Sequence, residues 1–305
     1  MMLGRSEPVA GTDHGVRKLT CGPYPSSPLR SLPGSRTYAA WVSHSPRLPT
    51  SWSSTAVRVA EVTATFWLIK GLSTALGESL SDYLVFAINP VVAVLLGFAG
   101  FLGALAVQLT RGRYRPWAYW IAVVMVGVFG TMAADVVHVV LRVPYLVSSA
   151  GYAAVLAAVF LTWWLVEGTL SMHEVTTLRR ELFYWTAVAA TFATGTAVGD
   201  LTAITLHLGY AGSIGLFAAA ICVPAAGYRW FRWNPTAAFW IAYVLTRPLG
   251  ASVADWTGKP TAVGGLGWGE GVMSLAFALV IAVLVARLSW QDRTDRATAF
   301  VLAAE

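Results

Sequence analysis

The chain has 305 residues, of which 56% are apolar and only 12% are charged. A soluble domain carries roughly 25% charged residues, so this composition excludes a soluble globular protein of this size. The net charge of +6 does not indicate a nucleic-acid-binding protein, because the basic residues lie in short clusters between apolar segments. Composition therefore predicts an integral membrane protein whose main partner is the lipid bilayer.

Residues 1–56 differ in composition from the rest of the chain. They are rich in Pro, Ser, Gly and Arg, as in PYPSSPLRSLPGSR, and contain no apolar segment long enough for a signal peptide or a membrane span. We interpret them as a disordered cytoplasmic tail, or as upstream sequence translated from a wrongly assigned start. Cys21 and Cys222 are far apart and indicate neither a disulfide framework nor a cysteine metal site.

From Val57 onward, apolar segments alternate with short turns, and each segment is close to the about 20 residues that a helix needs to cross a bilayer. The predicted spans are residues 61–87, 90–109, 117–141, 146–171, 182–207, 209–227, 236–256 and 269–288.

The connections between these spans differ in charge. After the even-numbered spans come RGRYRPW, HEVTTLRRE, YRWFRWN and RLSWQDRTDR, whereas the other connections hold only Arg142 and Lys259 as basic residues. The positive-inside rule places the basic loops and both termini in the cytoplasm. Four tryptophans beside the basic loops are typical of an aromatic belt at the headgroups: Trp117, Trp120, Trp230 and Trp233.

The odd-numbered spans repeat one pattern. In each, an aromatic residue precedes Trp, a Gly follows ten residues after the Trp, and an Asp follows five residues after the Gly. The positions are Trp67, Gly77, Asp82; Trp120, Gly130, Asp135; Trp185, Gly195, Asp200; and Trp240, Gly250, Asp255. The Gly and Trp residues are predicted to serve packing between the repeats, the Gly through close contact between helices.

Each copy of the pattern begins a unit long enough for two helices, so all four copies cross the membrane in the same direction. We therefore predict an all-α polytopic membrane protein of about eight transmembrane helices, built from four like-oriented helical hairpins. The predicted hairpins are residues 57–110, 111–172, 173–228 and 229–290 of a membrane domain at 57–290, followed by a cytoplasmic tail at 291–305.

Helical spacing also predicts a polar stripe. At 100° per residue, the seventh, eleventh and fifteenth residues after each Trp share one helical face with it. This face carries Thr74, Glu78 and Asp82 in the first copy, then Gly127, Thr131 and Asp135, then Thr196 and Asp200, then Arg247 and Asp255. Lipid would penalise such a stripe, so it is predicted to face protein or water.

At these residues the chain resembles a bacterial family of multi-pass membrane proteins, built from four copies of a repeat of unknown function and labelled membrane-anchored proteins. The resemblance lies in FWLIKGLSTALGESLSDYL, YWTAVAATFATGTAVGDLTA and FWIAYVLTRPLGASVADWTGKP, and extends over roughly residues 57–290. The second copy diverges most, with Val123, Val124 and Met125 in place of polar residues. The resemblance implies topology but no activity. The expected location is the plasma (inner) membrane.

The four aspartates and Glu78, one turn from Asp82, are the candidate ion or proton pathway. The alternative is that each Asp merely ends its helix, although a carboxylate there opposes the helix dipole. Lys70 and Arg247 are the predicted countercharges, Lys70 to Glu78 and Arg247 to Asp255, each two turns away. Three acids then remain uncompensated, so that either some are protonated or the bundle holds cations.

His138 and His207 follow Asp135 and Asp200 by three and seven residues. Asp and His at such spacing can ligate Zn or Mn, whereas a lone His near a helix end is otherwise an interfacial polar residue. A bound metal cation is therefore the one cofactor that the sequence suggests.

The leading hypothesis is a transporter or channel for a small cation, either a divalent metal ion or a proton, with the acids as its selectivity or coupling site. The alternative is a non-transporting membrane scaffold or sensor. No nucleophile and base stand together as in an enzyme, so catalysis is not predicted. The oligomeric state and the ion are left open.

Overall fold

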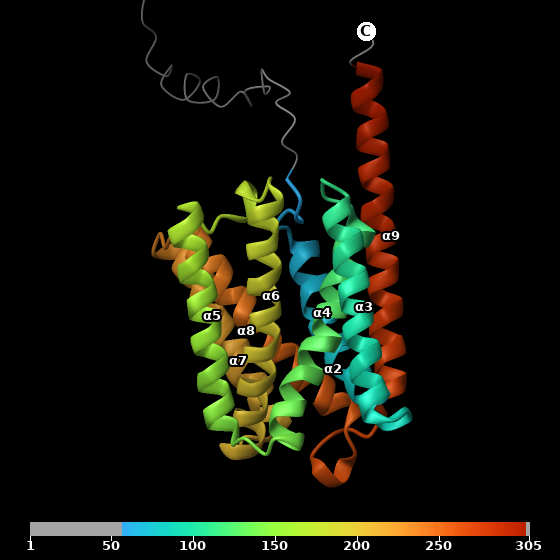
Figure 1. Ribbon diagram of the computed structural model, residues 1–305, viewed down its shortest axis with the longest axis vertical. Helices are drawn as coiled ribbons and strands as arrows, with labels where there is room; N and C mark the ends of the chain where they lie inside the picture. The colour runs from blue at the N-terminus through green and yellow to red at the C-terminus, as the bar shows by residue number, and fades with distance from the viewer. Residues whose placement is uncertain (1–56, 303–305) are drawn as a thin grey trace, which may run out of the picture. The chain divides into compact units, whose positions relative to one another are not determined.

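A computed structural model describes residues 57–302, and within this range the chain forms eight α-helices and no strand (Figure 1). The prediction for residues 1–56 lies outside the described residues. The helices are α2 (Ala64–Ala87), α3 (Pro90–Thr110), α4 (Pro116–Asp135), α5 (Tyr145–Glu167), α6 (Leu178–Asp200), α7 (Gly209–Trp230), α8 (Pro235–Gly258) and α9 (Glu270–Leu302).

Local sequence signals place the starts of these helices. Thr63 and Thr177 accept hydrogen bonds from the backbone N–H groups of the first turns of α2 and α6. An Asn-Pro pair begins α3 and α8. The Asn side chain accepts hydrogen bonds from the first backbone N–H groups, and the Pro occupies the first helical position. The predicted spans therefore agree closely with the helices, except that α9 continues to Leu302, so most of the predicted tail at 291–305 is helical.

Within the described residues, seven helices are long and apolar enough to cross a membrane. The exception is α2, which carries Lys70, Glu78 and Asp82 within its 24 residues. Because neighbouring helices surround its charged residues, we count α2 as the eighth helix of the bundle. The prediction of an all-α polytopic membrane fold is confirmed.

The first helices of the four hairpins form a closed ring. Contacts join α2 to α4, α4 to α6, α6 to α8, and α8 back to α2. The second helix of each hairpin lies outside the ring and packs mainly against the first helix of the next hairpin: α3 against α4, α5 against α6, α7 against α8, and α9 against α2. The last repeat thus closes the ring on the first, and the arrangement has approximate four-fold symmetry.

Aromatic side chains repeat this cyclic order at one end of the ring. The aromatic residue before each Trp contacts the Trp of the next repeat, with ring centroids 5.6 to 6.0 Å apart. The four pairs are Phe66–Trp120, Tyr119–Trp185, Tyr184–Trp240 and Phe239–Trp67. We call this set the aromatic layer. Trp120 is therefore inside the bundle and 1% exposed, and its assignment to a headgroup belt was wrong, whereas Trp117, Trp230 and Trp233 are exposed.

The four repeat glycines lie at the same helix contacts. A Cβ atom on Gly77 would lie 2.9 Å from Gly127 of α4, and one on Gly130 would lie 2.9 Å from Phe192 of α6. Side chains at the remaining two would meet Arg247 of α8 and Thr74 of α2. Each repeat glycine thus allows close approach to the next helix of the ring, the packing expected of small residues in membrane helices.

We expect Gly250→Ala to lower the free energy of unfolding by about 1–3 kcal/mol, because overpacking a tight contact forces side chains or backbone to move. The added Cβ would lie 3.1 Å from the backbone nitrogen of Ala75, which cannot rotate away. Thermal melting in detergent measures the effect. Gly71→Ala in α2 is the matched control, since a Cβ there meets no atom within 4 Å; an equal loss in both variants would contradict this account.

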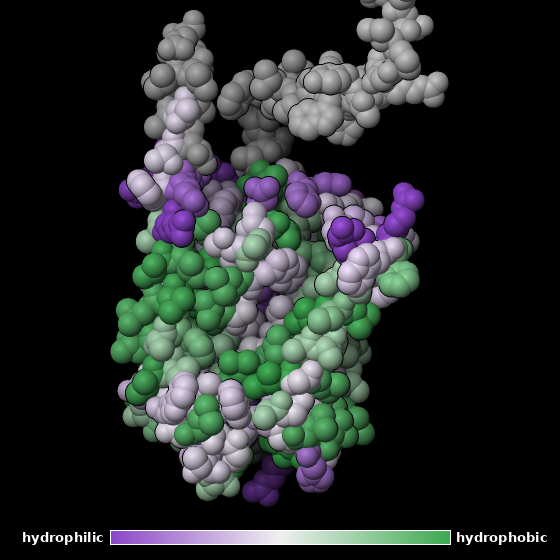
Figure 2. Space-filling view, turned by 180° about the vertical axis from the view of Figure 1, so that it is seen from behind, coloured by the Kyte–Doolittle hydropathy of each residue, from purple (hydrophilic) through white to green (hydrophobic). Residues whose placement is uncertain are grey.

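The outer helices present apolar side chains outward. More than half of the most apolar stretch is buried in α4, α6 and α8, against at most 22% in α3, α5, α7 and α9. Leu95, Leu165 and Val283 are each more than half exposed. On the face in Figure 2, hydrophobic residues cover broad areas across the middle, and hydrophilic residues gather toward the end with the basic loops. Such an apolar surface fits lipid rather than water.

Candidate functional site: a buried charge network and an acid cluster

The polar stripes of the four inner helices converge inside the ring. We call the end that carries the basic loops the basic end, and the end that carries the loop after α8 the acidic end. From the basic end toward the acidic end, the interior holds the aromatic layer, then Lys70 and Arg247, then Glu78 and the four aspartates.

Arg247 of α8 joins all four inner helices. Its side chain is fully buried, and its Nη2 donates to Glu78 Oε2 at 2.6 Å. The same nitrogen donates to the hydroxyls of Thr131 in α4 and Thr196 in α6, while Nη1 donates to the backbone carbonyl of Thr74 at 3.3 Å. Glu78, Thr131 and Thr196 each stand eleven residues after their Trp, so equivalent positions in three repeats bind one guanidinium.

Lys70 occupies an aromatic pocket beside Arg247. Its ammonium lies 4.3 Å from the ring centre of Phe192 and 4.2 Å from that of Tyr243, and among the described residues its Nζ has no hydrogen-bond partner. The Arg247 guanidinium lies 5.1 Å from the same Phe192 ring. Both predicted pairings were therefore wrong: Arg247 pairs with Glu78 of the neighbouring helix α2, and among the described residues Lys70 pairs with no acid.

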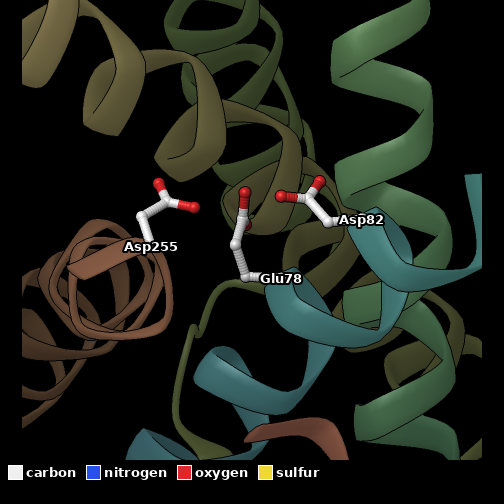
Figure 3. A group of neighbouring side chains, drawn as sticks. All are labelled: Glu78, Asp82 and Asp255. Atoms are coloured by element: carbon white, nitrogen blue, oxygen red, sulfur yellow. The ribbon is translucent and has the colours of Figure 1, made fainter. Parts of the chain in front are cut away.

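Glu78, Asp82 and Asp255 form an acid cluster. One carboxylate oxygen of each lies within 4.8 Å of those of the other two. Figure 3 shows Glu78 between the other two, with the three carboxylates converging on one space between α2 and α8. Oxygen ligands in such a group suit a hard divalent cation. Asp255 Oδ1 is buried and has no hydrogen-bond partner among the described residues.

Lys259, which the sequence did not single out, reaches this cluster from the loop after α8. Its ammonium pairs with Asp82 and lies 3.7 Å from Asp255 Oδ1. Burial lowers the pKa of Lys259, but the two aspartates outweigh burial and raise it above its ordinary value. The ammonium is therefore charged at neutral pH. The sequence did hold one signal for this contact: Lys259 follows Asp255 by four residues, a spacing that brings two side chains together on a helix.

Glu270, at the start of α9, also faces the cluster. Gly258 has no side chain, and this leaves room for the Glu270 carboxylate. A Cβ atom at this position would collide with that carboxylate. Coulombic interactions link Glu270 to Asp82, Lys259 and Glu78. Glu270 lies in the first turn of α9, where an acid is favoured by the helix dipole.

Asp135 and Asp200 occupy equivalent positions in the second and third repeats. Each is the last residue of its α-helix, and a π-helical turn follows, Val136–Val140 after Asp135 and Leu201–Thr205 after Asp200. Their carboxylates interact electrostatically with each other and with Glu78 and Asp82. The idea that each Asp ends its α-helix thus describes these two, whereas Asp82 and Asp255 lie within α2 and α8. π-Helical turns are common at functional sites.

The structure does not bring either candidate histidine into the acid cluster. The ring of His138 lies 3.2 Å from the carbonyl of Val143, within reach of the Ser148 hydroxyl, and against Tyr145. His207 is exposed in the turn before α7, with a left-handed backbone. The cation ligands that the geometry favours are carboxylates.

Acids outnumber bases in this interior. Three basic side chains, Lys70, Arg247 and Lys259, stand against six carboxylic acids: Glu78, Asp82, Asp135, Asp200, Asp255 and Glu270. The excess of three acids over bases equals the excess predicted from the sequence. The residues counted differ, because the structure adds one base, Lys259, and one acid, Glu270. Uncompensated charge in a membrane interior is costly, and it marks ion or proton sites in such proteins.

The chain itself crosses the basic end of the ring. Residues 57–62, which we call the crossing segment, run from the side of α6 to the start of α2, the helix opposite α6 in the ring. Arg58 pairs with the buried Glu181 of α6 at 2.9 Å, and Gln108 of α3 donates to the same carboxylate. Val59 and Ala60 are buried in the core cluster that contains the aromatic layer.

Comparison with known proteins gives the class of this chain. A family model described as a repeat of unknown function (DUF347) matches residues 118–169, 183–233 and 238–294, which together make up just over half of the chain. The protein is a membrane-spanning helical protein of this repeat family. The first hairpin lies outside the matched segments, although it completes the ring and carries Lys70 and Glu78. No curated protein and no solved structure matches the chain.

Proposed function

We propose that this protein is a transporter of a small cation, and that Glu78, Asp82 and Asp255 bind the cation during transport. The observation that carries the proposal is the convergence of three carboxylates inside a membrane bundle, beside further acids and with too few bases to neutralise them. Asp135 and Asp200 add negative potential from the other side of the ring.

The geometry favours a transporter over an open channel. The crossing segment and the aromatic layer lie across the basic end, and two fully buried basic side chains, Lys70 and Arg247, stand between that end and the acids. A cation on a fixed straight path would meet the guanidinium charge of Arg247. Release toward the basic end therefore requires the helices to rearrange, as in alternating access. On the acidic side Asp82 and Lys259 are 13% and 24% exposed, which gives access from that end.

The charge of the cluster favours a divalent ion. Arg247 neutralises Glu78, so the cluster has two further negative charges, on Asp82 and Asp255, and in this structure Lys259 pairs with Asp82. A metal ion of charge +2 would balance them, and carboxylates are the ligands that such ions prefer. Protons are the other candidate, since carboxylates also carry protons through membrane proteins.

We place the protein in the plasma membrane with both termini in the cytoplasm. The support is the distribution of basic residues, which are concentrated in the connections at the basic end. The acid cluster would then open toward the outside of the cell.

Asn substitution of the aspartates tests the proposal in vesicles that contain the purified protein. We expect Asp82→Asn and Asp255→Asn to reduce Mn²⁺ uptake at least tenfold, because each removes one of the three converging carboxylates, and Asp135→Asn and Asp200→Asn to reduce it less. An indicator dye trapped in the vesicles reports the ion, and a pH-sensitive dye reports proton flux. Glu61→Gln, an exposed acid ahead of α2, is the matched control.

Unchanged flux in all four folded Asn variants would refute the transport proposal. Absence of flux in the unmodified protein would instead favour the alternative, a non-transporting scaffold or sensor, in which these acids serve folding. The interhelical bonds of Arg247 are the observation behind that alternative. It predicts lower thermal stability in the same variants, with no flux in any of them.

A further inference from the structure

We propose that Lys259 is a tethered cation that occupies the acid cluster, so that a divalent metal ion binds there only when Lys259 leaves. This inference rests on the proposed function for the identity of the site, and adds how the site is regulated and which class of ion it selects.

The first support is the position of the ammonium. It pairs with Asp82 and approaches Asp255, two of the three residues whose oxygens converge. A cation coordinated by these oxygens would stand next to the ammonium, and like charges at such distances repel strongly in a poorly solvated site. Metal ion and ammonium therefore exclude each other.

The second support is that the cluster has a free ligand. Asp255 Oδ1 is buried without a hydrogen-bond partner among the described residues, and the residue is 7% exposed. The ammonium at 3.7 Å from this oxygen is beyond hydrogen-bonding distance. A lysine alone thus satisfies the cluster incompletely, and a metal ion with several coordination positions satisfies it better.

The third support is the way in which Lys259 is attached. It follows the last residue of α8, and the loop after it folds back along the end of this helix. Backbone hydrogen bonds hold the return: Gly267 to the Lys259 carbonyl, Trp268 to Thr257 and Gly269 to Gly258. Both Gly267 and Gly269 have left-handed backbones that other residues rarely adopt. Lys259 itself lies just beyond the end of α8, so rotation of its flexible side chain would withdraw the ammonium without breaking these bonds.

Charge gives the class of ion. With Arg247 on Glu78, the cluster carries two net negative charges, of which Lys259 neutralises one. Replacing the ammonium by a divalent ion neutralises both, whereas a monovalent ion gains nothing over the lysine already present. The exchange therefore selects divalent over monovalent cations.

Mn²⁺ binding to the purified full chain in detergent tests the inference, with free Mn²⁺ measured by electron paramagnetic resonance. We expect Lys259→Met to bind Mn²⁺ at least about tenfold more tightly than the unmodified protein, and Lys259→Arg to bind as weakly as the unmodified protein. Arg142→Met is the matched control, an exposed basic residue in another loop at the acidic end, and should change the affinity less than about twofold.

The outcomes separate the two proposals. Equal affinity in Lys259→Met and the unmodified protein, or tight binding in Lys259→Arg, overturns the inference, while Mn²⁺ uptake into vesicles would still support transport. Binding that survives Asp255→Asn in the Lys259→Met background also overturns it, because the ion then lies elsewhere. Absence of both binding and uptake in every variant overturns the two together. If Lys259→Met does not fold, Lys259→Gln gives the same comparison, since it removes the charge and still donates hydrogen bonds.

Discussion

Replacing Arg247 with Met is expected to lower the free energy of unfolding by about 3–5 kcal/mol, because it removes one partner of a buried ion pair. The guanidinium is fully buried and bonded to the other three inner helices. Its removal leaves the Glu78 carboxylate buried without its cation and two threonine hydroxyls without their shared donor. Thermal melting in detergent measures the loss.

The charge of Glu78 accounts for most of this loss, so a second substitution should recover part of it. In the double variant Glu78→Gln/Arg247→Met no unpaired charge remains, and we expect it to melt at a higher temperature than Arg247→Met alone. Arg287→Met on the exposed face of α9 is the control and should be close to neutral. A double variant no more stable than Arg247→Met would show that packing, and not charge, dominates at this position.

Replacing Lys70 with Met is expected to have the opposite effect and raise the free energy of unfolding by about 1–3 kcal/mol. Burial strips water from the ammonium, and within the described residues no acid and no hydrogen-bond acceptor replaces it. Attraction to the rings of Phe192 and Tyr243 offsets part of the lost hydration free energy, while the charge of Arg247 adds repulsion. Met fills a similar volume without a charge.

Two comparisons test this explanation of Lys70. Ile69→Met, at the neighbouring fully buried position, keeps the apolar character and should cost less than about 1.5 kcal/mol. Lys70→Arg keeps a charge but brings a bulkier guanidinium to a fully buried position, and should lower stability. A lower melting temperature for Lys70→Met would contradict the account and would indicate that the two aromatic rings stabilise the ammonium fully. A lysine retained at a cost in stability is expected where its charge serves function.

Much of this fold could be predicted from sequence because the repeat keeps exact spacing. Trp, Gly and Asp recur at fixed intervals, so they occupy matched depths in parallel helices whatever the packing between them. The same reasoning placed Glu78, Thr131 and Thr196 on one face of their helices. It also found the glycines of close contact, since a small residue at the same place in each copy indicates a repeated helix contact.

The partners of charged residues could not be predicted in the same way. Spacing along one helix suggested Lys70 with Glu78 and Arg247 with Asp255, yet Arg247 reaches Glu78 from a helix 169 positions later in the chain. Spacing reports only which residues share a face of one helix. The nearest opposite charge depends on which helices lie side by side, and this is determined by how the helices pack in the folded protein.

The sequence by itself determined the membrane class, the helices, the four-fold repeat and the matched depth of Trp67, Gly77, Asp82 and their counterparts, because each of these follows from local hydropathy and covalent spacing. Only the tertiary structure decided that each outer helix packs on the next repeat, that α9 closes the ring on α2, and that Lys259 lies at the acid cluster. These depend on contacts between distant segments, since only closure of the ring brings Asp82 of the first repeat beside Asp255 of the last.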